Sequence, residues 1–155
     1  LSRFHLIQGD LRDIRLRRSF PLVTSSPPYY KTGEGLLSPD HNRASVRFEL
    51  QGGIEDYFHA ASDHLAPGGF FTTVYPRQYA RRVFSAAEKF DFHLERQIDI
   101  VPRQTKPPLI TLFSFRRTTP GKGVVTSLTV RGSDQYFTGA FKKIRREMGF
   151  PEKSS

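Results

Sequence analysis

Residues 20–30 read Phe-Pro-Leu-Val-Thr-Ser-Ser-Pro-Pro-Tyr-Tyr, a short apolar run that ends in small polar residues, two prolines and two aromatic residues. Residues 22–24 predict a buried strand. The two prolines have no backbone N–H and a fixed φ, so strand pairing must stop there and the backbone must turn rigidly. At this turn Ser26 offers a hydroxyl, the prolines offer carbonyls and Tyr29 offers an aromatic face. These groups suit a flat ring with an exocyclic amine: the oxygens accept the amine hydrogens while Tyr29 stacks on the ring.

The sequence Ser26-Pro27-Pro28-Tyr29 resembles motif IV of the S-adenosylmethionine (SAM) dependent amino-methyltransferases, whose signature is Asp/Asn/Ser-Pro-Pro-Tyr/Phe/Trp. These enzymes methylate the exocyclic amine of adenine or cytosine. The resemblance implies that Ser26, Pro27, Pro28 and Tyr29 are catalytic residues and that S-adenosyl-L-methionine is the cofactor. Pro-Pro-aromatic sequences also occur in proline-rich ligands, so the tetrapeptide alone leaves the function open.

Two flanking segments indicate which group of amino-methyltransferases the sequence resembles. Residues 43–49, Arg-Ala-Ser-Val-Arg-Phe-Glu, and residues 65–71, Leu-Ala-Pro-Gly-Gly-Phe-Phe, resemble the bacterial tRNA adenine-N6-methyltransferase group that modifies a valine tRNA. The resemblance covers approximately residues 4–117, and it implies adenine N6 as the target and tRNA as the partner. Ser26 leaves cytosine open, because that group usually has Asn at this position and Ser-Pro-Pro-Tyr is more typical of cytosine-N4 DNA methyltransferases.

The cofactor side of the expected site is incomplete. Residues 4–8 alternate weakly and predict a short strand that ends at Gly9-Asp10. The resemblance implies that Asp10, with Leu11, contacts SAM, although without the downstream match Asp10 is better explained as a turn residue. The Gly-x-Gly spacings, at 33–35 and 121–123, do not lie between a strand and a helix as a SAM-binding loop requires. We therefore expect the carboxyl-terminal two-thirds of a methyltransferase, in which the first strand pairs in a new register or a protein partner or oligomer completes the SAM site.

Residues 30–51 are polar, contain glycine and lack clear periodicity, which predicts a long loop over the target base. The resemblance implies that basic residues of this loop contact the RNA backbone. The candidates for nucleic-acid binding are Lys31, His41, Arg43 and Arg47. Alternatively, Arg47 and Glu49 pair with neighbours and only order the loop.

Composition and charge limit the classes of protein. A chain of 155 residues predicts one domain, with a partial methyltransferase at 1–117 and a small strand-helix appendix at 118–155. The absence of cysteine excludes disulfides and cysteine-ligated zinc, and His59 and Asp63, at i and i+4, lack a third ligand, so no metal site is expected. With no apolar run of membrane-spanning length and no amino-terminal signal sequence, we expect a cytoplasmic protein and no membrane partner. The net charge of +9 and the pI near 10.2 favour a polyanionic partner such as RNA.

Hydrophobic periodicity predicts an α/β chain. The resemblance adds the fold class, which is the carboxyl-terminal part of a Rossmann-like class I methyltransferase sheet with a final antiparallel hairpin. The predicted elements are a strand at 22–24, a helix at 53–65, a strand at 70–75, a helix at 76–90, strands at 92–101 and 109–116, an edge strand at 124–130 and a helix with Phe137, Phe141, Ile144 and Met148 on one face. Residues 102–108 predict a rigid turn rather than a site. The basic opposite face of the last helix predicts a solvated surface, with RNA binding as the alternative.

The main hypothesis for function is SAM-dependent methylation of the exocyclic amine of an RNA base, first of all adenine N6 in tRNA. Three alternatives stay open. The chain is a truncated, non-catalytic remnant that binds nucleic acid, a subunit that needs a partner to complete the SAM site, or a basic α/β domain without a role in nucleic-acid chemistry.

Overall fold

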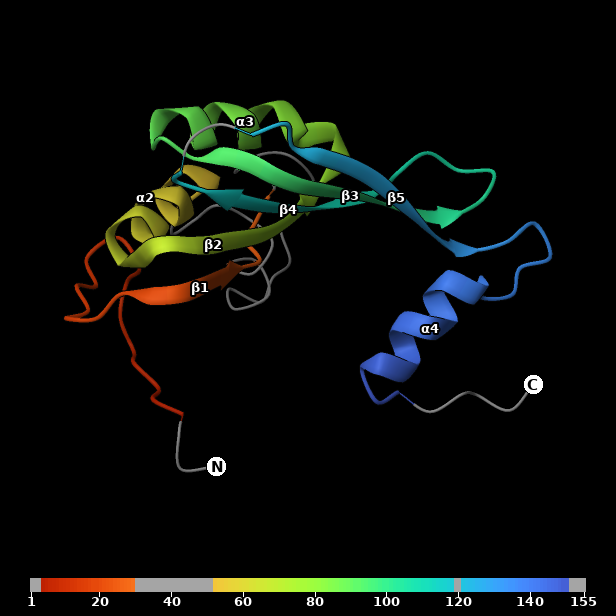
Figure 1. Ribbon diagram of the computed structural model, residues 1–155, viewed down its shortest axis with the longest axis horizontal. Coiled ribbons are helices and arrows are strands. Elements are labelled where there is room, and N and C mark those ends of the chain that lie inside the picture. The colour runs from red at the N-terminus through yellow and green to blue at the C-terminus, as the bar shows by residue number, and fades with distance from the viewer. Residues whose placement is uncertain (1–3, 30–51, 119–120, 151–155) are drawn as a thin grey trace, which may run out of the picture.

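The computed structural model describes residues 4–29, 52–118 and 121–150. One mixed sheet carries helices on one of its faces (Figure 1). The elements are β1 (Phe20–Ser25), α2 (Ile54–His64), β2 (Leu65–Pro76), the 3₁₀ turn Arg77–Tyr79, α3 (Ala80–Lys89), β3 (His93–Arg103), β4 (Ile110–Arg116), β5 (Val124–Arg131) and α4 (Gly139–Glu147).

The strand order is β1-β2-β4-β3-β5. The pairs β1–β2 and β3–β5 are parallel, and β4 runs antiparallel to both of its neighbours. The carboxyl ends of β1, β2, β3 and β5 therefore meet at one edge of the sheet. This topology confirms the predicted α/β fold with its antiparallel β3–β4 hairpin. The predicted edge strand β5 joins the same sheet beyond β3.

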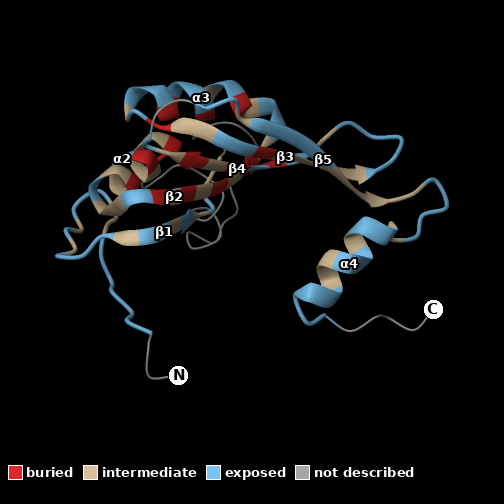
Figure 2. Cartoon of the chain, in the orientation of Figure 1, coloured by how far each residue is buried: buried red, intermediate tan, exposed pale blue. Residues whose placement is uncertain are grey.

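The core lies between the sheet and the two helices α2 and α3, where the buried residues gather (Figure 2). Phe58 of α2 is fully buried, and its ring centroid lies 4.9 Å from that of Phe71, 5.4 Å from Phe92 and 5.2 Å from Phe115. Aromatic edge-to-face pairs at such distances add to the free energy gained by burial. One helix side chain thus joins β2, β4 and the residue that precedes β3.

A short bulge lets β1 approach β2 closely. The register between the two strands shifts between Phe20 and Leu22. In β2, Gly68 has φ +74°, which favours glycine, and a Cβ on Gly69 would lie 2.9 Å from the backbone oxygens of Pro21 and Ala66. The glycine pair after α2 therefore sets how β1 enters the sheet, in addition to ending the helix.

The opposite face of the sheet is not covered by a helix in the part of the chain that the structure describes. Leu22 and Leu112 on this face are 54% and 40% exposed, and Arg116 lies over the ring of Phe70 at 3.8 Å. Helix α4 lies beside the sheet rather than against the middle of this face (Figure 1). The strand at 22–24 is therefore an edge strand with an exposed side, and the prediction that it is buried is wrong.

Two further sequence predictions are wrong in detail. Residues 4–8 form no strand and are exposed, because they leave the sheet instead of pairing with it. In β3, a register shift between Leu94 and Arg96 reverses the alternation of side chains. Gln97, opposite Phe113, therefore faces the core, whereas Ile98 lies opposite the half-exposed Leu112.

The aromatic cluster around Phe58 predicts a large effect of truncation. We expect Phe58→Ala to lower the free energy of unfolding by about 3–5 kcal/mol, because it removes a buried ring that packs against three other aromatic rings. Urea denaturation followed by circular dichroism measures this loss. The matched control is Phe4→Ala, at a residue that is 86% exposed. A similar loss in both variants would contradict the assignment of the core.

Candidate functional site

A pocket of about 570 Å³ opens at the edge of the sheet where β1 and β2 end. Its volume lies in the range of about 300–1,000 Å³ that is typical of small-molecule sites. The lining residues come from the turn after β1, the end of β2 and the start of β4. They are Ser26, Tyr29, Val74, Tyr75, Pro76, Gln78, Pro107, Pro108, Leu109 and Ile110. Two of the four predicted catalytic residues, Ser26 and Tyr29, thus line one cavity.

The turn after β1 builds the first wall of the pocket. Ser25, the last residue of the strand, donates from its hydroxyl to Thr73 Oγ1 of β2 at 2.9 Å. Pro27 is buried next to this contact, and the chain then places the ring of Tyr29 edge-on to Tyr75, with centroids 6.2 Å apart and planes at 80°. Tyr75 is only 1% exposed, so it gives Tyr29 a fixed neighbour.

The turn before β4 builds the second wall. Because β4 runs antiparallel to β2, with Ile110 opposite Pro76, the start of β4 must lie where β2 ends. The backbone N–H of Arg77 donates to the Leu109 carbonyl at 3.0 Å, and that of Leu109 donates to the Ile100 carbonyl at 2.9 Å. Pro107 and Pro108 therefore belong to the pocket, contrary to the expectation that this segment is only a turn. The order of the strands in the sheet brings these two prolines to the pocket, and the sequence around them does not predict this position.

A polar network stiffens this end of the sheet. Thr111 donates to Asp99 Oδ1 at 2.6 Å and Gln97 donates to the same oxygen at 3.0 Å. Arg77 donates from Nε to Asp99 Oδ2 at 3.3 Å. The network holds the turn that carries Gln78, a pocket residue with both a donor and an acceptor group. Gln78 is a site residue that the sequence analysis missed.

The chemistry of the pocket follows from its lining. Aromatic and proline rings supply apolar walls, while the Ser26 hydroxyl and the Gln78 amide supply groups that can accept or donate hydrogen bonds. Such a site accepts a flat ring and the hydrogens of an amine on that ring. A second hollow of about 290 Å³ lies on the uncovered sheet face around Thr72, Val74 and Leu112, and most of the surface that it exposes is apolar.

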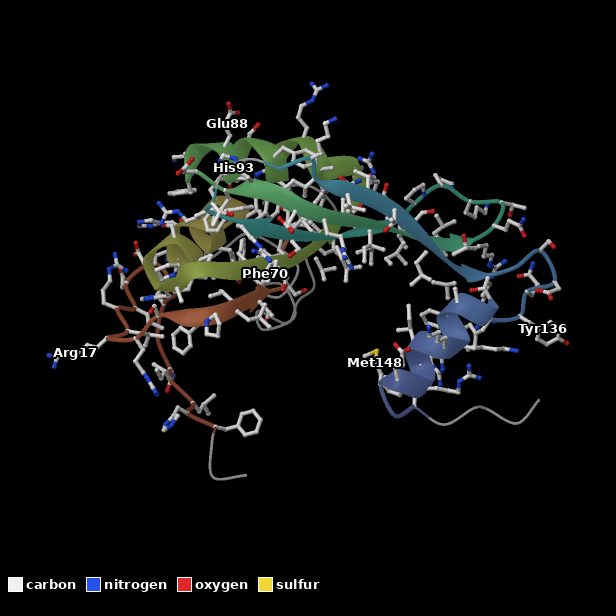
Figure 3. All side chains as sticks on the ribbon, viewed as in Figure 1. Arg17, Phe70, Glu88, His93, Tyr136 and Met148 are labelled. Carbon is white, nitrogen blue, oxygen red and sulfur yellow. The ribbon has the colours of Figure 1, made fainter. Side chains whose placement is uncertain are left out.

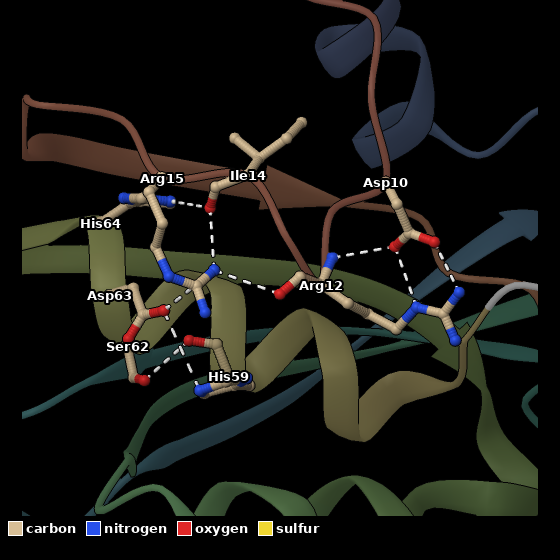
Figure 4. A network of polar contacts seen from close by, with 8 residues as sticks. All are labelled: Asp10, Arg12, Ile14, Arg15, His59, Ser62, Asp63 and His64. Carbon is tan, nitrogen blue, oxygen red and sulfur yellow. Dashed lines mark hydrogen bonds and ion pairs between the residues drawn. The ribbon is translucent and has the colours of Figure 1, made fainter.

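The carboxylate of Asp10 is engaged by its neighbour Arg12 (Figure 4). The backbone N–H and the Nε of Arg12 each donate to Asp10 Oδ1 at 2.9 Å, and its Nη2 donates to Oδ2. These hydrogen bonds, from the side chain first and the backbone second, hold the pKa of Asp10 at about 2. Arg15 lies 3.7 Å from Asp63 of α2, which ties the segment to that helix.

The described residues do not form a cradle for SAM. The Asp10 carboxylate already binds a guanidinium, and no glycine-rich loop between a strand and a helix occurs within residues 4–29, 52–118 and 121–150. Leu11 lines a different hollow, of about 260 Å³, together with Tyr57 and His64. The cofactor contacts expected of Asp10 and Leu11 therefore stay predictions.

The remaining sequence candidates are only partly visible. Lys31, His41, Arg43 and Arg47 lie outside the described residues. His59 and Asp63 approach to 3.9 Å, and the described part of the chain contains no group of three side chains that could bind a metal ion. Among the helices described, none has the length and apolar character needed to span a membrane.

The Asp10–Arg12 contact can be tested by titration. We expect an Asp10 pKa of about 2, and Arg12→Ala should raise it toward the ordinary value of about 3.9 because the side-chain donors are lost. Since the folded pKa is the lower one, the contact stabilises the fold above about pH 4 and this contribution is lost as the pH falls toward 2. Carbon-13 NMR of the carboxyl group follows the pKa, with Arg18→Ala as control. An unchanged pKa in Arg12→Ala would refute the contact.

Comparison with known proteins finds methyltransferases among the proteins similar to this chain. No family model matches the chain. It is 26% identical over 147 residues to a tRNA1(Val) (adenine(37)-N6)-methyltransferase of Erwinia tasmaniensis, covering 94% of this chain and 59% of the relative. It is 28% identical over 124 residues to the protein of the same name from Salmonella paratyphi B, covering 79% and 49%. The chain thus spans about half to three-fifths of the length of these relatives.

A solved structure supports the fold. A predicted O-methyltransferase from Agrobacterium tumefaciens superposes with a TM-score of 0.60 at 17% identity, over 82% of this chain and 51% of that chain. At this identity the match speaks for the fold alone. The comparisons confirm that the chain resembles the tRNA1(Val) adenine-N6-methyltransferases over most of its own length and that it has an α/β methyltransferase fold.

Proposed function

We propose that this chain is the base-binding part of a SAM-dependent methyltransferase that acts on the exocyclic amine of a base in RNA, with adenine N6 of a cytoplasmic tRNA as the first candidate. The pocket that joins Ser26 and Tyr29 to Pro107 and Pro108 is the observation that carries the proposal. The names of the similar proteins and the net charge of +9 support RNA as the substrate.

In this proposal the pocket holds the amine for reaction. The base leaves its stack and enters beside Tyr29, whose ring packs on the face of the base. Oxygens of Ser26 and Pro27 accept the two amine hydrogens, which fixes the direction of the nitrogen lone pair. The contribution of these residues is positioning, because a correctly oriented nucleophile needs less ordering in the transition state.

SAM supplies the methyl group in the enzymes that this chain resembles. Asp10 and Leu11 are the described residues that we expect to contact it, and the proposal places the rest of the SAM site outside the described residues. A variant of the proposal is favoured by the uncovered sheet face and by the outer edge of β1, along which no described strand pairs. In that variant a second polypeptide or another copy of the chain pairs at this edge and completes the SAM site.

Methyl transfer tests the main proposal. The full chain is incubated with labelled SAM and unmodified tRNA, and the products are analysed as N6-methyladenosine or N4-methylcytidine. We expect Tyr29→Ala to lower the rate about tenfold or more, since stacking of one base contributes about 1–3 kcal/mol. Tyr29→Phe keeps the ring and should retain most of the activity.

Three outcomes separate the proposals. Equal rates for Tyr29→Ala and the unchanged chain would refute the role of this pocket. An inactive chain that still binds tRNA through Tyr29 would support the subunit or the non-catalytic remnant instead. A chain that does not bind tRNA at all would refute an RNA substrate.

A further inference from the structure

In the appendix formed by β5 and α4, hydrogen bonds of Thr138 fix the helix to the strand. The Thr138 hydroxyl donates to the Thr129 carbonyl at 2.6 Å and accepts from the Phe141 N–H at 3.2 Å, which caps α4. The N–H of Thr138 also donates to the Val130 carbonyl at 3.0 Å. The orientation of α4 relative to β5 is therefore set by the same residue that begins the helix.

This appendix carries an excess of positive charge. Residues 121–150 contain six lysines and arginines against two acidic residues, whereas residues 52–118 contain nine against seven. We call the cluster the carboxyl-terminal basic surface. It consists of Arg131, Lys142, Lys143, Arg145 and Arg146. The ion pair of Lys143 with Glu147 is long, at 4.0 Å, and both side chains are more than half exposed, so it screens little of the charge.

Aromatic rings accompany these charges. The guanidinium of Arg131 lies 4.4 Å from the centre of Phe137, and that of Arg145 lies 5.3 Å from Phe137 and 5.4 Å from Phe150. Stacked guanidiniums keep a fixed plane, so less entropy is lost when they donate to a phosphate. Tyr136, at the outer end of the appendix, is 68% exposed and offers a face for stacking (Figure 3).

The carboxyl-terminal basic surface lies at the same sheet edge as the pocket. Arg131 of β5 is in register with Arg103, the last residue of β3. The N–H of Gln104 donates to the Arg131 carbonyl at 3.0 Å. The turn that continues from Gln104 reaches Pro107 and Pro108 in the pocket wall. A strand of RNA with one base in the pocket can therefore continue along β5 and α4.

We propose that the carboxyl-terminal basic surface binds the phosphodiester backbone of the same RNA whose base enters the pocket. This inference rests on the proposed function for the identity of the polyanion. An anionic membrane surface is less well matched, because α4 has only nine residues and Phe141 and Ile144 on its apolar side are partly buried.

Two triple variants with equal loss of charge test the inference. The first, Lys142→Gln, Lys143→Gln and Arg146→Gln, changes exposed residues of α4. The control, Arg17→Gln, Arg18→Gln and Lys89→Gln, changes exposed residues near the opposite edge of the sheet, before β1 and at the end of α3 (Figure 3 labels Arg17). Circular dichroism verifies that both fold.

Equilibrium binding to tRNA is measured at several salt concentrations. We expect the α4 variant to bind about tenfold more weakly, and the slope of log K against log salt to fall by about 2, because phosphate contacts are lost. The control should change affinity less than about threefold, since in this account its residues do not contact phosphate. If both triple variants bind tRNA more weakly to the same extent, or if neither binds it more weakly, the inference is overturned.

Two further arms separate the sources of failure. The affinity for vesicles rich in phosphatidylserine is measured as well. If the α4 variant binds these vesicles more weakly but binds tRNA as tightly as the unchanged chain does, the surface binds lipid and the inference is overturned. Methyl transfer is measured on the same samples. If the chain transfers no methyl group but its tRNA affinity depends on α4, the catalytic proposal is contradicted and the inference about α4 is supported. If the chain transfers methyl groups but its tRNA affinity does not depend on α4, the catalytic proposal is supported and the inference about α4 is overturned.

Discussion

Pro27 and Pro28 cannot donate to a strand ladder, so the pairing of β1 with β2 ends at Ser25 and Thr73. The chain must leave the sheet at that point, and it turns so that Tyr29 contacts Tyr75. A second Pro-Pro pair lies before β4, at the same edge of the sheet. Prolines therefore restrict the backbone in both segments that form the walls of the pocket. The remaining features of the site depend on this rigidity.

The two faces and the outer edge of the sheet contribute differently to the molecule. The helix-covered face supplies stability through the aromatic cluster around Phe58. The carboxyl edge supplies the pocket and, beside it, the basic appendix. The other face and the outer edge of β1 are uncovered in the described residues, and the Asp10 carboxylate accepts hydrogen bonds from Arg12. The described residues thus form one pocket of a size that suits a base, which is the site that we propose, whereas they contain no glycine-rich loop between a strand and a helix.

Local sequence signals predicted the helices and most strands, because proline and glycine positions and apolar spacing act over a few residues. The same signals failed where distant pairing decides the outcome. The bulge after Leu94 reversed the alternation and placed Gln97 in the core. Pro107 and Pro108 became pocket residues only through the order of β2 and β4. The strand expected at 4–8 found no partner, and the basic residues of 30–51 lie outside the described structure.

The most direct test of the pocket is a crystal structure of the chain soaked with adenosine. We expect electron density for the adenine ring between Tyr29 and Pro108, with its amine directed toward the oxygens of Ser26 and Pro27. Adenine bound on the uncovered face near Leu112, or at the Leu11 hollow, with the pocket empty would contradict it.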